Sequence, residues 1–247
     1  EVIKIEPPGG DKTRKLPGLG IGFFRSFNRN KKSVVLDIQT PEGMANAKEL
    51  IGECDVLLEN FRPGLMEKLG LGYKTLSQEF PKLIYVSHKG FLPGPYENRL
   101  ALDEVVQNMA GLTYMTGPKG QPLRAGSSVN DIMGGMFGAI GVLAALRERD
   151  RTGSGQEIQS ALFENCCLLA SQHMQQFEMT GEVPHPFPSR VSAWSVYDTF
   201  EVAHNEQLFI GAVSDKQFLS LCNVIQRPDL ANEPELATNA QRVAVRP

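Results

Sequence analysis

An aspartate at the predicted start of a helix is the residue of this chain best placed to do chemistry. Asp131 ends the segment GSSVND (126–131) and opens an apolar, glycine-bearing helix predicted over residues 131–147. A carboxylate there commonly caps the helix, because it accepts hydrogen bonds from backbone N–H groups that lack a helical partner. Alternatively, an unperturbed pKa of about 3.9 leaves it ionised at neutral pH, ready to act as a nucleophile without a base. The helix N-terminus would then offer N–H groups to a developing oxyanion.

A second candidate site follows the predicted strand over residues 56–58. The segment ENFRPG (59–64) places Asn60, Phe61 and Arg62 directly after this strand. Ligands of parallel α/β sheets bind at the carboxyl ends of the strands. An amide, a ring that can stack on a base and a guanidinium fork for phosphate suit a nucleotide-containing ligand. An ordinary strand-to-helix turn would explain the same residues.

The third feature is local positive charge. Residues 1–32 hold eight lysines and arginines against three acids, whereas the whole chain has a net charge of -3. The segment is also rich in glycine, so ammonium groups and free backbone N–H groups could bind phosphate. Arg29 and Lys32 are candidate phosphate partners on charge alone, and a solvated basic loop is the alternative. The acidic balance of the whole chain argues against a general nucleic-acid binder.

The histidines and cysteines predict no metal site and no hydrolase triad. Neither set has metal-ligand spacing, and no Gly-x-Ser-x-Gly elbow is present. We therefore expect the histidines to be structural or surface residues (His88, His173, His185 and His204). The cysteines are expected to be reduced core thiols, which indicates an intracellular compartment (Cys54, Cys166, Cys167 and Cys222).

Short apolar runs alternate with helical patterns through the first 160 residues. Strands are predicted over residues 2–5, 34–38, 56–58 and 83–86, and helices over 41–51, 103–109, 131–147 and 162–179. This alternation predicts an α/β fold with a Rossmann-like parallel sheet. We expect a large ligand-binding and catalytic domain over residues 1–180 and a proline-rich linker over 181–191. A smaller, incomplete α+β domain is expected over residues 192–247, with strands at 196–202 and 208–213 and a helix at 215–226.

The most apolar stretch, residues 132–146, is shorter than the roughly 20 residues of a membrane-spanning helix, so no membrane span is expected. The chain opens within a predicted strand and without methionine. We therefore expect a processed or truncated N-terminus, with any targeting segment out of view.

Several segments in register resemble one enzyme family. Residues 2–11 (VIKIEPPGGD) resemble the VIKVE-PPGGD segment of class III CoA-transferases, and residues 28–37 resemble their NRxKxSxxLD strand entry. Residues 59–64 match ENFRPG, and residues 151–156 match the R-TGxGQ turn after the catalytic helix. The resemblance extends from residue 1 to about residue 243, and the motifs keep the family's order and spacing. Relative to the family, the chain lacks an opening strand and helix and a C-terminal return segment.

The resemblance implies a mechanism and a set of contacts with coenzyme A. It places the family's nucleophilic aspartate at Asp131, which would form a mixed anhydride and then an aspartyl-CoA thioester. CoA contacts carry over to Leu36, to the 60–62 turn, and to Leu102 and Asp103. Two basic positions found in some relatives are Pro7 and Leu100 here, which removes the expected contacts at those two positions.

The resemblance is strongest to the mitochondrial succinyl-CoA:glutarate branch. It implies succinyl-CoA as donor, a dicarboxylate such as glutarate as acceptor, a location in the mitochondrial matrix, an interlocked homodimer and no permanently bound cofactor. Two alternatives remain. The racemase branch of the same fold uses a histidine where this chain has Leu102, and a truncated product would bind CoA or pair with another subunit without catalysis.

Overall fold

Parallel strands form the first half of the chain. The computed structural model describes residues 1–190 and 192–246. Strands β1 (Val2–Glu6) and β2 (Lys31–Val35) pair in parallel, and β3 (Val56–Glu59), β4 (Ile84–Lys89) and β5 (Glu157–Ala161) form a second parallel sheet. The predicted parallel α/β class is confirmed. The strands divide into two sheets rather than one, and β5 lies where the sequence pattern predicts no strand.

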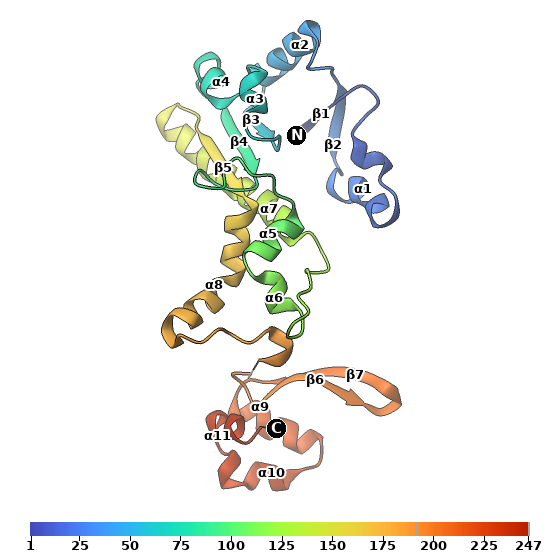
Figure 1. The fold of residues 1–247 in the computed structure, drawn as a ribbon, viewed down its shortest axis with the longest axis vertical. Helices are drawn as coiled ribbons and strands as arrows, with labels where there is room; N and C mark the ends of the chain where they lie inside the picture. The colour runs from blue at the N-terminus through green and yellow to red at the C-terminus, as the bar shows by residue number, and fades with distance from the viewer. Residues whose placement is uncertain (191, 247) are drawn as a thin grey trace.

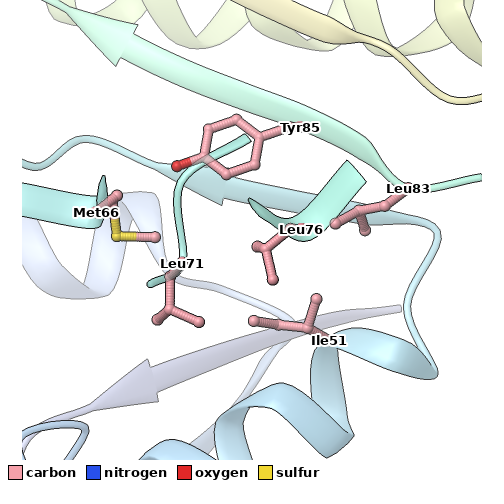
Figure 2. Packing of buried hydrophobic residues seen from close by; sticks show 6 residues of the cluster. All are labelled: Ile51, Met66, Leu71, Leu76, Leu83 and Tyr85. Atoms are coloured by element: carbon pink, nitrogen blue, oxygen red, sulfur yellow. The ribbon is translucent and has the colours of Figure 1, made fainter. Parts of the chain in front are cut away.

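Strand β4 is the centre of the fold because both of its faces are buried. Leu83, which directly precedes the strand, and Tyr85 pack with side chains of helices α2 (Pro41–Gly52), α3 (Leu65–Lys68) and α4 (Tyr73–Glu79) (Figure 2). On the opposite face, Ile84 and Val86 pack against Ala145 of helix α7 (Val129–Thr152). Period-two alternation with apolar side chains on both faces is typical of a strand buried between two layers of helices.

Helix α7 carries Asp131 and packs against β4, β5 and α8 (Leu162–Thr180). It is 24 residues long, whereas the sequence pattern predicts residues 131–147. Three of its four glycines allow close approach of a neighbour: an added Cβ would lie 2.5 Å from the His88 ring at Gly138 and 2.8 Å from Ile158 at Gly141, and would contact Asn165 at Gly134. Close packing therefore compensates for the low helix propensity of these glycines.

The length of α7 corrects the expectation that no stretch could span a bilayer. By length and composition alone, Val129–Thr152 could cross a membrane. A single such helix is weak evidence for a span, because a helix packed inside a globular fold passes the same test. One side of α7 packs against β4, β5 and α8.

The remaining elements extend the molecule along its long axis (Figure 1). Helices α5 (Asp103–Met109), α6 (Leu112–Thr116) and α8 share a small core around Val106 and Cys166. After a 3₁₀ turn at Phe187–Ser189, an antiparallel hairpin and a group of helices lie at the far end from β1 and β2. The last residue of the expected linker, Val191, lies outside the described residues, as does Pro247. The remaining α-helices and strands are α1 (Phe23–Phe27), β6 (Val196–Val202), β7 (Glu206–Ala212), α9 (Asp215–Val224), α10 (Pro228–Asn232) and α11 (Asn239–Ala244).

Candidate active site

Asp131 lies in the first turn of α7 and does not cap it. The helix begins two residues earlier than predicted, with Ser128 at the N-cap position and no side-chain hydrogen bond from Ser128. The cap comes instead from α5: Asp103 Oδ2 accepts hydrogen bonds from the backbone N–H groups of Asn130 (2.8 Å) and Asp131 (3.1 Å). Within the described part of the chain, the Asp131 carboxylate itself accepts no hydrogen bond. The structure therefore assigns the capping role to Asp103 and leaves the Asp131 side chain available.

The surroundings of Asp131 make its carboxylate more basic than usual. Partial desolvation and the negative charges of Asp103 and Glu104 raise the pKa of Asp131 to about 6, and Arg124 opposes this increase. The residue remains exposed to solvent. At pH 7 a pKa of about 6 still leaves roughly ten ionised carboxylates for each protonated one. Asp131 is thus an ionised group with greater proton affinity than a free aspartate.

Most N–H groups at the N-terminus of α7, which the sequence suggested as donors to an oxyanion, have partners within the protein. The N–H groups of residues 130 and 131 bind Asp103, as described above. Val129 N donates to Ser127 O (2.9 Å) and Ile132 N donates to Ser128 O (3.1 Å). The bond from Ile132 is the first of the helix itself, so three of the four N–H groups that a helix start leaves without helical partners, those of residues 129, 130 and 131, are occupied.

The turn after β3 is held by a buried glutamate. Glu59 is 8% exposed, its Oε2 accepts a hydrogen bond from Phe61 N (2.7 Å), and its Oε1 accepts one from the hydroxyl of Ser87 on β4. These bonds order the backbone of the turn, while Asn60, Phe61 and Arg62 remain exposed. The phenyl ring of Phe61 is 46% exposed although it is large and apolar. The turn therefore presents to solvent the three side chains that the sequence proposed for CoA.

A second buried glutamate orders the loop after β1. Glu6 is 1% exposed and accepts hydrogen bonds from Arg14, from Ser33 and from the backbone of Asp11. These donors, led by Arg14, lower the pKa of Glu6 to about 2. The glutamate that ends this strand thus has the same structural role as Glu59. Its ion pair with Arg14 removes one of the eight basic side chains of residues 1–32 from ligand binding.

The other predicted contacts lie on several elements. Arg29 is exposed, Lys32 forms an exposed ion pair with Glu1 (Nζ–Oε1, 2.7 Å), and Leu36 follows β2 and is half-buried. Leu102 directly precedes α5 and is 67% exposed. Among the residues described, no hydrogen bond or ion pair joins these groups to Asp131. Only Asp103, 28 residues before Asp131, is brought into direct contact with it.

Sequence reasoning missed Gln107 next to this site, and it expected His88 only as a structural or surface residue. Gln107 on α5 is fully buried and binds both Asp103 and the loop before α7. Its signal was its spacing, four residues after Asp103 on one helix face. His88 ends up packed against α7 at Gly138, two turns beyond Asp131, and burial lowers its pKa.

Comparison with known proteins identifies the family. The model of "CoA-transferase family III" matches residues 1–247. The chain belongs to this family. Its fold agrees with that of a family III protein from Brucella suis, a "CAIB/BAIF family protein", at a TM-score of 0.83 and 34% identity over 99% of this chain and 67% of that one. The order of elements around Asp131 is therefore a property of the CoA-transferase III fold.

Curated family III proteins similar to the chain have different substrates in their names. They include "Acetyl-CoA:oxalate CoA-transferase" of Acetobacter aceti (38% identical, 98% of this chain and 64% of the relative) and "Succinate--glutarate CoA-transferase" of Agrobacterium fabrum (36%, 99% and 64%). The "Succinyl-CoA:glutarate CoA-transferase" of Mus musculus is 34% identical over 98% of this chain and 57% of the relative. The chain thus spans less than two thirds of the length of these relatives. The narrower assignment to the glutarate branch is not singled out by these identities.

Proposed function

We propose that the protein transfers coenzyme A between carboxylic acids, with Asp131 as the nucleophile. The observation that carries this proposal is that the carboxylate of Asp131 is exposed at the first turn of α7, while a neighbouring carboxylate performs the capping role. A capping aspartate would accept hydrogen bonds from N–H groups of its own helix. Membership of CoA-transferase family III supports the same conclusion.

The proposed reaction needs only the carboxylate and the two substrates. Asp131 attacks the thioester carbonyl of the donor acyl-CoA, the C–S bond breaks, and CoA thiolate leaves a mixed anhydride behind. The thiolate attacks the aspartyl carbonyl, releases the donor acid and forms an aspartyl-CoA thioester. The acceptor carboxylate then displaces the thiolate to form a new anhydride. Attack of the thiolate on the acyl carbonyl releases the new acyl-CoA and regenerates Asp131.

The CoA moiety is proposed to bind at the ordered turns that follow β1 and β3. Phe61 offers an exposed ring for stacking and Arg62 a guanidinium for phosphate. Leu36, Arg29, Lys32 and Leu102 are proposed to complete these contacts. The side chain of Asp103 is buried and bonded to backbone N–H groups, so we propose its backbone, not its carboxylate, as the CoA contact.

Replacing Asp131 by asparagine in the intact enzyme tests this function. Asparagine is a good helix cap but a poor nucleophile, so Asp131→Asn and Asp131→Ala should both abolish transfer. Mass spectrometry of the parent enzyme with acyl-CoA should detect a CoA adduct on Asp131. Substantial transfer by Asp131→Asn, with deamidation excluded, would refute the role of Asp131.

We propose succinyl-CoA as donor and a dicarboxylate such as glutarate as acceptor. The names of the Agrobacterium and mouse relatives support this choice, whereas that of the Acetobacter relative favours acetyl-CoA and oxalate. A panel of succinate, glutarate, oxalate, malate and acetate with both donors distinguishes them. Racemisation is a weaker alternative, because Leu102 can neither accept nor donate a proton at the position of the racemase histidine.

We also propose a homodimer, a matrix location and the domain division at residues 181–191. The outer face of α7 supports the dimer, because Met136, Ile140 and Leu143 are 60%, 57% and 68% exposed at helical spacing. The molar mass of the intact protein in solution tests the dimer.

The location rests on resemblance to the mitochondrial branch, and fractionation of the source cells tests the location. Limited proteolysis within 181–191 tests the domain division.

A further inference from the structure

The side chain of Gln107 connects the two ends of the segment that leads to Asp131. It is fully buried on α5, and a buried amide requires hydrogen-bond partners on both of its ends. Its Oε1 accepts a hydrogen bond from Ala125 N at 2.8 Å, and its Nε2 donates to Asp103 Oδ1. The same amide therefore contacts the loop before α7 and the carboxylate that caps α7.

The hydrogen bonds form one continuous chain. Ala125 N donates to Gln107, Gln107 donates to Asp103, and Asp103 accepts from the backbone of Asn130 and Asp131. The segment 125–131 is thereby fixed at both ends by one face of α5, on which residues 103 and 107 are neighbours four positions apart. Ser128 provides no side-chain cap, so the orientation of the first turn of α7 depends on this chain.

We propose that Gln107 is a positioning residue for CoA transfer: its amide holds Asp103 against the first turn of α7 and so sets the position of the Asp131 carboxylate. This inference rests on the proposed function. Only an amide fits the position, because one end must accept a hydrogen bond from a backbone N–H group and the other must donate to a carboxylate. Methionine has a similar length but offers neither group, and glutamate would place a second carboxylate against Asp103.

The network predicts that its hydrogen bonds are kept when the amide and the carboxylate are exchanged between positions 107 and 103. In the double variant Asp103→Asn/Gln107→Glu, the new amide at position 103 can donate to the new carboxylate at position 107. The amide oxygen can still accept from residues 130 and 131, and the new carboxylate can accept from Ala125 N. Every hydrogen bond of the parent is then present with the amide and the carboxylate exchanged. Each single substitution leaves a donor or an acceptor without a partner.

The test is steady-state kinetics on the intact enzyme, with the acyl-CoA and acceptor that the parent uses fastest. Gln107→Met and Gln107→Glu should lower kcat about 10- to 100-fold, because a small displacement of a reacting group has an effect of that size. The KM for acyl-CoA should stay within about twofold, since the Gln107 amide bonds the carboxylate of Asp103 and the backbone of Ala125, whereas the CoA contact proposed at residue 103 is its backbone. The double variant should recover kcat to within about threefold of the parent.

Ser160→Ala is the matched control. Its hydroxyl is buried and donates to Gly134 O (3.1 Å), so this variant also removes a buried hydrogen bond to α7 but leaves segment 125–131 intact. It should lose stability and keep kcat, which separates positioning from general destabilisation. If Gln107→Glu does not fold, Gln107→Met and the double variant, each compared with the parent, decide.

Unchanged kcat in Gln107→Met, or a folded double variant with kcat as low as Gln107→Glu, would overturn the proposal. A parent enzyme that turns over but forms no adduct on Asp131 would refute the proposed nucleophile, and the positioning role with it. Capture of that adduct in the parent, with unchanged rates in the Gln107 variants, would refute only the role of Gln107.

Discussion

Two glycines of α7 should respond in opposite directions to the same substitution. At Gly135 an added Cβ meets nothing within 4 Å, whereas at Gly138 it would lie 2.5 Å from Cε1 and 2.9 Å from Nε2 of His88. Alanine is favoured over glycine within a helix by about 1 kcal/mol. Gly135→Ala should therefore increase the free energy of unfolding by up to about 1 kcal/mol.

At Gly138 the gain in helix propensity is outweighed by steric strain. Forcing extra atoms into a packed site costs about 1–3 kcal/mol, and the ring must move because contacts below 3.0 Å are not tolerated. The net expectation is a loss of roughly 1 kcal/mol. The two alanine variants should thus differ by about 2 kcal/mol, although they lie one turn apart on the same helix.

Urea denaturation of the intact protein, followed by circular dichroism, measures both values. His88→Ala supplies the control, since removal of the ring makes room for the new methyl group. In the double variant Gly138→Ala/His88→Ala the two changes should be non-additive by at least about 1 kcal/mol. Equal stability of the two glycine variants, or additive effects with His88→Ala, would refute the packing described here.

Three further predictions concern charge. First, kcat/KM should rise about tenfold per pH unit below about pH 6 and level off above it, because Asp131 has a pKa of about 6 and acts when ionised. Glu104→Gln should shift the rising part of this profile to lower pH, and Arg124→Gln should shift it to higher pH. Coincident pH profiles of the parent and the two variants would contradict the assignment. Second, Glu6→Gln should destabilise the protein by about 1–3 kcal/mol at pH 7. Because the pKa of Glu6 is lowered to about 2, its contribution is complete above its unfolded value of 4.5 and is lost as the pH falls through about 2, so urea midpoints of variant and parent should converge over that range. Third, Arg62→Ala should weaken CoA binding about 10- to 100-fold. Calorimetry should show a smaller loss of affinity for dephospho-CoA if Arg62 binds the 3′-phosphate, and an equal loss of affinity if it binds the pyrophosphate. No change in affinity for either ligand would place CoA elsewhere.

Local patterns in the sequence were sufficient for the parallel α/β class and for several of its strands and helices, but not for β5. Apolar runs separated by helical periodicity indicate parallel strands, because the burial of each side chain depends on its spacing within its own element. The helix over 103–109 and the strand over 196–202 were predicted with the bounds that the structure shows. The position of Asp131 at a predicted helix start is also a local property, and the resemblance to class III CoA-transferases made this residue the candidate nucleophile.

Contacts between distant residues decide which carboxylate caps α7. A carboxylate near a helix start is most often a cap, and whether its side chain is left free depends on whether another group satisfies the N–H donors. Asp103 does so from 28 residues away, and Gln107 holds it there. In the same way, the pairing of β5 with β4 and the packing of His88 against Gly138 are set by which elements meet in space. Contacts between different elements depend on tertiary packing, for which the spacing of residues along the chain carries no signal; only the contact of Gln107 with Asp103, four residues apart on one helix, had such a signal.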